Sequence, residues 1–196
     1  MAADTSRCLV QSDAYLIEAS RKDPGSFAVV FERHFVAVHR YLTRRVGAQL
    51  ADDLAAETFA TALRARHDYD QKWPDARSWL FGIATRLLQA QWRAEGRRLS
   101  AIARMERESP PDGVADVGVA RADAESIRPR LASALLSLNP NQRDVILLAA
   151  WADLSFDEIG HALGIPPGTV RSRLHRARVS LRARLGDLNG SIEGGD

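Results

Sequence analysis

Apolar residues recur along most of the chain at intervals of three and four positions, the spacing that gives an α-helix one apolar face. The strict alternation that is typical of strands is absent from the sequence. Ala, Leu and Arg, which favour helices, dominate the composition. The pattern predicts an all-α protein, with helices over about 13–22, 27–46, 50–66, 75–98, 127–138, 140–149, 156–163 and 167–185.

The composition changes between Glu106 and Glu125, where prolines, glycines and acidic side chains replace the apolar periodicity. Such a stretch buries little apolar surface and favours a flexible acidic linker. We therefore expect two small helical domains, 12–104 and 126–186, joined by a linker over 105–125. A disordered tail over 187–196 would follow them.

The charge, the cysteine content and the lack of a long apolar run exclude several classes of protein. The net charge is +2, from 27 Lys and Arg against 25 Asp and Glu. The single Cys8 excludes an internal disulfide framework and a cysteine-based zinc site. No apolar run is long enough to span a membrane, and the first residues lack the features of a secretion signal. We expect a cytoplasmic protein without membrane insertion, cofactor or bound metal.

The segment from Ser155 to Leu185 carries the most informative motif. Ser155 and Glu158 have the spacing of a capping box in front of an apolar run. Gly164 stands where a helix needs a left-handed residue to end, and Pro167 suits the first turn of another helix. Two helices joined by so short a turn form a helix-turn-helix.

The second helix of this motif has an apolar face and a polar face. The apolar face consists of Val170, Leu174, Ala177, Leu181 and Leu185. Because early residues of such a helix reach base edges in the major groove, we expect base contacts from Arg171, Ser172, His175 and Arg176. Arg173 and Arg178 are better placed for phosphates, and Thr169 lies at the start of the same DNA-binding surface.

The alternative is that these arginines only solvate a surface helix. No acidic residue occurs between Glu158 and Asp187, which favours DNA binding.

Three stretches resemble bacterial RNA polymerase sigma factors. Leu138–Arg178, with GTVRSRLHRAR at its end, resembles region four. Asp52–Leu63 and Arg77–Arg93 resemble region two. Regions one and three have no counterpart, a layout that resembles the extracytoplasmic-function class.

The resemblance implies a transcription initiation factor that binds core RNA polymerase and promoter DNA and is regulated by an anti-sigma factor. Region four would bind the −35 promoter element through the helix-turn-helix. Region two would bind the polymerase through Asp52, Asp53, Glu57 and Phe59. It would open the −10 element through Trp73, Arg77, Arg86, Gln89, Trp92, Arg93 and Arg97.

Aromatic and basic residues agree with the role in opening DNA, because separated bases stack on aromatic rings along a basic groove. Trp79 shares a face with Ile83 and Leu87 and is expected in the core, whereas Trp73 and Trp92 are more open candidates. The sequence departs from the family pattern at Ala56, Arg86 and Ala90, which affects the expected polymerase contact and the identity of the −10 sequence.

Two other functions would account for parts of the sequence. A stand-alone repressor or activator would bind two-fold sites as a dimer, but that function leaves the basic, tryptophan-bearing N-terminal part unexplained. Glu158 and His161 have the Glu-x-x-His spacing of helical di-metal enzymes, but such sites need a second copy, which the sequence lacks. The sequence therefore favours a non-enzymatic DNA-binding protein.

Overall fold

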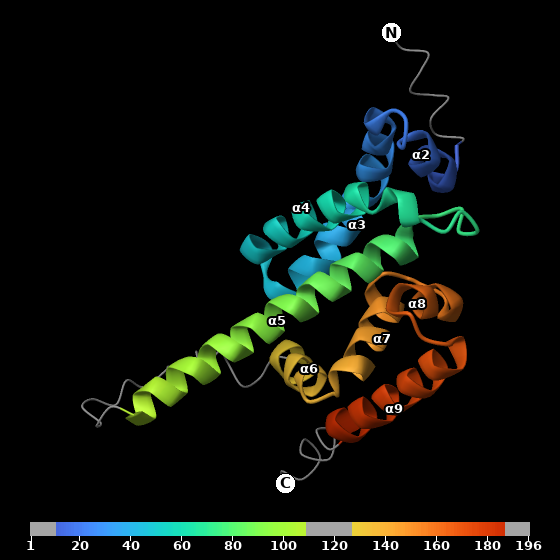
Figure 1. Ribbon diagram of the computed structural model, residues 1–196. Helices are drawn as coiled ribbons and strands as arrows, with labels where there is room; N and C mark the ends of the chain where they lie inside the picture. Colours follow the sequence, from blue (N-terminus) through green and yellow to red (C-terminus); the bar gives the residue numbers. More distant parts are fainter. Residues whose placement is uncertain (1–10, 109–126, 187–196) are drawn as a thin grey trace. The chain divides into compact units, whose positions relative to one another are not determined.

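The computed structural model describes residues 11–108 and 127–186 (Figure 1). These residues form helices, two short 3₁₀ turns and no strand, which confirms the predicted all-α fold. The helices are α2 (Asp13–Ala19), α3 (Phe27–Val46), α4 (Ala48–Arg64), α5 (Arg77–Glu108), α6 (Ile127–Leu136), α7 (Pro140–Trp151), α8 (Phe156–Leu163) and α9 (Pro167–Gly186). None of these helices is both long and apolar enough to cross a membrane.

The described residues divide into two compact units. The first contains residues 11–88 and 147–171, and the second contains 89–108, 127–146 and 172–186. Helix α5 continues to Glu108, so residues 105–108 of the expected linker are helical. The rest of that linker, the tail over 187–196 and Cys8 lie outside the described residues.

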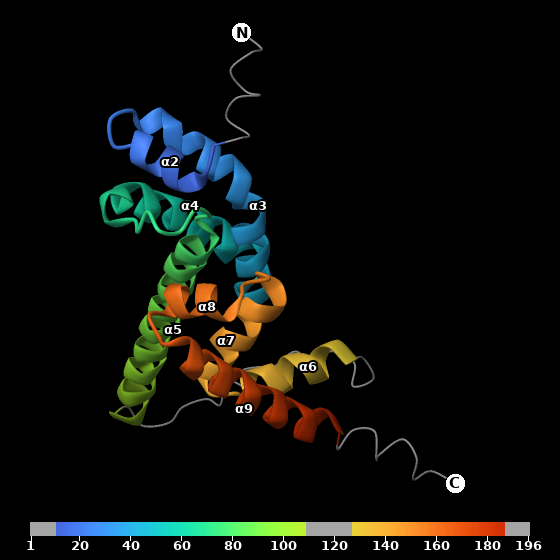
Figure 2. The same cartoon turned by 90° about the vertical axis from the view of Figure 1, so that its right-hand side faces the viewer.

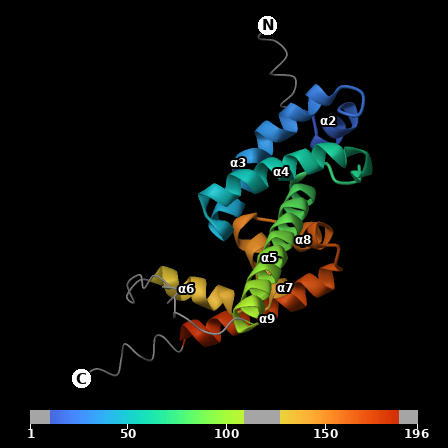
Figure 3. The ribbon, with the colours of Figure 1, turned by 60° about the vertical axis from the view of Figure 1, so that its left-hand side comes forward.

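In the first unit, α3 and α4 run alongside each other (Figure 3), and α2 lies against the N-terminal half of α3 (Figure 2). Gly47 ends α3, as the sequence predicted, and its φ of 81° lets the chain reverse into α4. Their apolar faces form a core that includes the buried residues Val30, Val38, Leu42, Leu54, Ala55 and Ala62.

The prediction that Ser26 caps α3 was wrong, because its hydroxyl makes no capping hydrogen bond. It donates to Asp23 at 3.3 Å instead. Asp23 caps the 3₁₀ turn Pro24–Ser26, which leads directly into α3, so Ser26 already has helical backbone angles.

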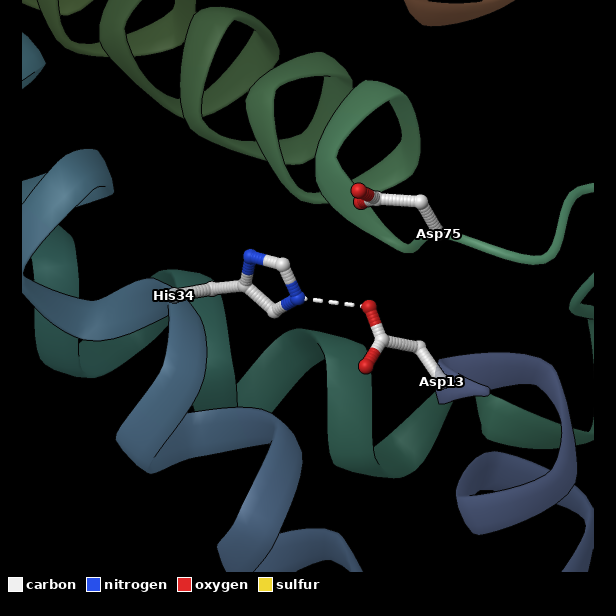
Figure 4. A group of neighbouring side chains, drawn as sticks. All are labelled: Asp13, His34 and Asp75. Carbon is white, nitrogen blue, oxygen red and sulfur yellow. Dashed lines mark hydrogen bonds and ion pairs between the residues drawn. The ribbon is translucent and has the colours of Figure 1, made fainter. Parts of the chain in front are cut away.

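A buried network around Asp13 joins α2, α3 and the start of α5 (Figure 4). Asp13 Oδ1 accepts a hydrogen bond from Arg33 at 2.8 Å, and Oδ2 accepts one from the Ala76 N–H at 2.9 Å. His34 Nε2 lies 2.6 Å from the same Oδ2. Burial raises the pKa of Asp13, but the hydrogen bonds from His34, Ala76 and Arg33 outweigh it and lower the pKa to about 2.

Asp75 completes this group. Asp13, His34 and Asp75 each offer one possible ligand atom, and these three atoms all lie within 4.8 Å of one another. That spacing suits a metal ion, but both Asp13 oxygens already accept hydrogen bonds. Asp75 in turn accepts from the Arg77 N–H at 2.7 Å, at the start of α5. The group therefore acts here as a structural network that fixes the loop before α5.

In the second unit, Asn139 caps α7, as predicted, because its side chain accepts from the Asn141 N–H at 3.0 Å. Arg143 on α7 donates to the carbonyl of Leu135 at 2.8 Å and to that of Leu138 at 3.0 Å. These bonds satisfy one carbonyl in the last turn of α6 and one just after the helix, neither of which has a partner within that helix.

Candidate nucleic-acid interface

The predicted capping box at the start of α8 is confirmed. Ser155 Oγ accepts from the Glu158 N–H at 3.3 Å, and Glu158 Oε2 accepts from the Ser155 N–H at 2.7 Å. The two bonds satisfy backbone donors at the helix N-terminus and fix where α8 begins.

The turn between α8 and α9 spans residues 164–166. Gly164 adopts the left-handed conformation, with φ 65° and ψ 37°, as its position predicted. The Ile165 N–H donates to the Gly160 carbonyl at 2.9 Å. A Cβ at Gly160 would lie 2.8 Å from the Ile165 carbonyl oxygen, so this close approach also depends on Gly160. The sequence pattern gave no sign of this requirement.

Helix α9 has the two faces that its sequence predicted. Val170, Leu174 and Ala177 are buried, while Leu181 and Leu185 are half-buried. Among the predicted DNA-binding residues, Arg171, Ser172, His175, Arg176 and Arg178 are exposed, and Thr169 and Arg173 are half-buried. The helix carries six arginines and no acidic residue, so its exposed face offers positive charge and hydrogen-bond donors to an anionic ligand.

The loop before α5 holds Trp73 in a defined position. Tyr69 Oη donates to the Trp73 carbonyl at 2.6 Å, and the Ala14 N–H donates to the Pro74 carbonyl at 3.3 Å. Burial raises the pKa of Tyr69, with smaller contributions from neighbouring carboxylates, so the hydroxyl remains a donor. Trp73 is half-buried and its ring stacks on that of His161 at 4.4 Å and 18°.

The other residues expected to open the −10 element lie on α5. Arg86, Arg93 and Arg97 are exposed, while Arg77, Gln89 and Trp92 are half-buried. Trp79 and Leu87 were expected in the core but are only half-buried. Trp79 packs against Tyr69 at 4.9 Å, and the fully buried positions of this stretch include Leu80, Phe81, Ala84 and Leu88.

His161 contacts the start of α5, a contact that the sequence pattern does not predict. Its Nδ1 is hydrogen-bonded to Ser78 Oγ at 2.8 Å, across 83 residues of sequence. Burial lowers the pKa of His161, Asp70 raises it and Arg86 lowers it, with a net decrease. No local pattern announces a contact between positions so far apart, so only the tertiary structure could reveal this pair.

The residues expected to bind polymerase lie on α4. Asp52, Asp53 and Glu57 are exposed, and the hydrogen bond from Arg64 lowers the pKa of Glu57. Phe59, in contrast, is only 5% exposed.

Phe59 packs under two aromatic residues of α3. Its ring lies 4.9 Å from that of Phe31 and 6.1 Å from that of Phe35. Phe31 is 39% exposed and carries this aromatic cluster to the surface. Phe31 and Phe35 are four residues apart and therefore lie on one face of α3. This spacing was the sequence signal that could have identified the aromatic cluster.

Comparisons with known proteins give the family. Residues 30–98 match the family described as Sigma-70 region 2, and residues 128–181 match Sigma-70, region 4. The RNA polymerase sigma factor CarQ of Myxococcus xanthus is 35% identical over 167 residues, which cover 83% of this chain and 91% of CarQ. The ECF RNA polymerase sigma factor SigE of Mycolicibacterium smegmatis is also 35% identical over 167 residues, covering 82% of this chain and 62% of SigE.

A solved structure agrees with these matches. CnrH, in complex with the cytosolic domain of CnrY, superposes with a TM-score of 0.62 at 26% identity, over 89% of this chain and 97% of CnrH. The capped helix-turn-helix, the region 2 and region 4 matches and the relatives agree: the chain belongs to the ECF class of bacterial RNA polymerase sigma factors, which are promoter-recognising transcription initiation factors.

Proposed function

We propose that this sigma factor binds the −35 element with α9, opens the −10 element with the loop over 70–76 and with α5, and binds core polymerase with α3 and α4. The observation that carries the proposal is the exposed basic face of α9, the second helix of a helix-turn-helix whose first helix, α8, is capped at both ends. The family matches at 30–98 and 128–181 each fall within one of the domains 12–104 and 126–186, which supports that division of labour.

At the −35 element, the first turns of α9 would enter the major groove. Arg171, Ser172, His175 and Arg176 would contact base edges, while Thr169, Arg173 and Arg178 would hold the phosphates on either side. Arginine suits both tasks because its planar guanidinium makes paired hydrogen bonds to guanine and to phosphate.

At the −10 element, Trp73 and Trp92 would stack on separated bases and Gln89 would contact them. Arg77, Arg86, Arg93 and Arg97 would hold the backbone of the strand. The anchored loop supports this role for Trp73, because a ring held in place loses little conformational entropy when a base stacks on it.

At the polymerase, Asp52, Asp53 and Glu57 would provide charge, and Phe31 would provide an apolar contact. Phe59 would act by supporting Phe31 from below.

We further propose that the protein acts in the cytoplasm, that it is not an enzyme, and that an anti-sigma factor regulates it. The family resemblance implies these properties, and CnrH was solved with a bound polypeptide, the cytosolic domain of CnrY.

Run-off transcription tests the proposal directly. The purified protein would be combined with bacterial core RNA polymerase and genomic fragments, and the transcripts sequenced. We expect defined start sites that require this protein and share two spaced upstream elements. A lack of transcripts, together with dimeric binding to a palindromic duplex, would instead identify a conventional repressor or activator.

A further inference from the structure

The α4–α5 loop, residues 65–76, joins the end of α4 to the start of α5 and carries Trp73. It lies beside α2 (Figure 1), and its 3₁₀ turn contacts that helix. Helix α2 spans Asp13–Ala19, before residues 30–98, the part of the chain that matches Sigma-70 region 2. The family match therefore assigns no role to α2.

The first half of the α4–α5 loop is bonded to the C-terminal end of α2. The Arg21 guanidinium donates a hydrogen bond to the His67 carbonyl at 2.9 Å. In the opposite direction, Arg66 Nε donates to the Ser20 carbonyl at 3.2 Å. The two bonds hold the backbone of the loop and the backbone after α2 together, close to the point where the loop leaves α4.

The second half of the loop is bonded to the same helix. The Gln71 side-chain amide donates to Glu18 Oε2 at 3.2 Å. Glu18 also pairs with Arg21 at 3.0 Å, so its carboxylate links the bonds of the two halves. The Ala14 N–H donates to the Pro74 carbonyl at 3.3 Å. The bonds from α2 therefore reach the loop on both sides of its tryptophan.

Hydrogen bonds matter more than apolar burial in this loop. Only Tyr69 and Ala76 of residues 65–76 are buried, so little apolar surface fixes the conformation of the loop. A site whose binding-competent conformation is only partly populated binds more weakly by that fraction. Bonds that keep the loop in one conformation therefore raise its affinity for a base that stacks on Trp73.

We propose that Glu18 and Arg21 are positioning residues for the −10 strand. They hold the α4–α5 loop in the conformation in which Trp73 accepts an unpaired base, and the affinity for the strand depends on them. This inference rests on the proposed role of Trp73, and it extends the −10 site to a helix outside the region 2 match.

Glu18→Ala separates positioning from charge, because the two roles predict opposite changes. The full-length chain would be assembled with core RNA polymerase and bound to the fluorescein-labelled non-template −10 strand of a promoter mapped by run-off transcription. If Glu18 acted only through its charge, its loss would tighten binding to the polyanionic strand. As a positioning residue, its loss should weaken binding by roughly 2- to 10-fold, the effect of one lost hydrogen bond.

Two further variants control for this change. Glu18→Gln removes the charge but keeps an acceptor for Gln71, so it should restore most of the affinity. Glu32→Ala removes an exposed carboxylate from α3 instead, and should bind the strand at least as tightly as the unchanged protein. Full affinity of Glu18→Ala, or an affinity of Glu18→Gln no better than that of Glu18→Ala, would overturn the proposal.

Arg21→Ala tests the other positioning residue. Lys22→Ala removes the same charge from the next position, which is exposed, and is its control. Arg21→Ala should weaken binding to the −10 strand more than Lys22→Ala does, and should leave binding to the −35 duplex unchanged. Equal losses for the two variants would show an effect of charge alone. Equal losses on the two DNA probes would show a general loss of structure, and either result would overturn positioning by Arg21.

Trp73→Ala distinguishes failure of this inference from failure of the proposed function. If Trp73→Ala binds the −10 strand as tightly as the unchanged protein, the proposed role of Trp73 is wrong and the inference falls with it. If Trp73→Ala weakens binding while Glu18→Ala and Arg21→Ala do not, the role of Trp73 stands and positioning by these two residues is overturned.

Discussion

Single residues on the exposed face of α9 should differ in what they contribute to binding. Arg176 lies toward the N-terminal half of the helix and is exposed, so we expect it to contact a base edge. Arg176→Ala should weaken binding to the cognate −35 duplex by about 1–3 kcal/mol and leave binding to a scrambled duplex almost unchanged. Fluorescence anisotropy with both duplexes would measure this difference.

Arg184→Ala serves as the control, because Arg184 is also exposed but lies in the last turn of α9. It should affect both duplexes alike. If Arg176→Ala also weakens both duplexes equally, Arg176 belongs with the phosphate contacts.

Asp13 should make the free energy of unfolding depend on pH in the acidic range. Its pKa is lowered from 3.8 to about 2 in the folded chain, so its contribution is complete above about pH 4 and is lost as the pH falls toward 2. Asp13→Asn should therefore lower the free energy of unfolding by about 2 kcal/mol at neutral pH. It should also remove the pH dependence that the titration of Asp13 gives to this free energy. Urea unfolding at a series of pH values would measure both effects.

Glu18→Gln is the matched control, since Glu18 lies on the same helix and pairs with Arg21 at the surface. Such an exposed pair contributes about 1 kcal/mol or less. If the two variants had the same unfolding curve at every pH, the Asp13 network would not stabilise the fold.

Residue-level predictions succeeded where the signal was local. The buried positions Val170, Leu174 and Ala177 followed from helical spacing alone. The partners of His161 and Asp13 did not, because Ser78 and Ala76 are brought to them only by tertiary packing. Trp79 shows the same limit, since its place on an apolar face did not reveal that it would pack against Tyr69 and remain half-buried.

At the level of elements, the helix-turn-helix depends on the residue that ends α8. Gly164 has a φ of 65°, a conformation that costs a residue with a Cβ roughly 1–2 kcal/mol. Gly164→Ala should destabilise the chain by about that amount and weaken binding to the −35 duplex, as measured by urea unfolding and anisotropy.

Gly168→Ala is the control for this change. Gly168 lies in the first turn of α9, has no atom within 4 Å of its Cβ position and does not have a positive φ. Alanine should be neutral or slightly stabilising there. Equal destabilisation by both variants would mean that the left-handed turn is not the cause.

The ends of elements were predictable where one residue type satisfies a backbone requirement. Ser155, Gly164 and Gly47 fall in this group, because capping and left-handed geometry restrict the choice of residue. Ser26 was not predictable, since Asp23 competes with it for the same helix start. The extension of α5 to Glu108 was also missed, because the acidic composition of its last residues favoured a linker.

At the scale of the whole molecule, the compact units do not follow the order of the chain. The first unit combines residues 11–88 with 147–171, so α8 shares a unit with α2, α3 and α4. Composition marks where a chain loses its apolar periodicity, but it carries no information about which distant helices pack together. The hydrogen bond between Ser78 and His161 joins two such distant helices.

Acidification should destabilise the fold through His161, whose Nδ1 is hydrogen-bonded to Ser78. The pKa of His161 is lowered by burial and by Arg86 and raised by Asp70, and the net decrease places it below the ordinary value of about 6.5. Asp75, Asp157 and Glu158 line the groove beside it. Because the unfolded chain binds a proton on His161 more readily than the folded one, the contribution of His161 to stability is complete above about pH 6.5 and is lost as the pH falls below it.

The free energy of unfolding should therefore fall as the pH is lowered from about 7.5 to about 5.5, by at most about 1.4 kcal/mol per pH unit because one proton is involved. His161→Gln keeps a hydrogen-bonding side chain that does not titrate, so its free energy of unfolding should lack this fall. Urea unfolding at a series of pH values would measure both proteins, and parallel curves for the two would assign the pH dependence to other groups.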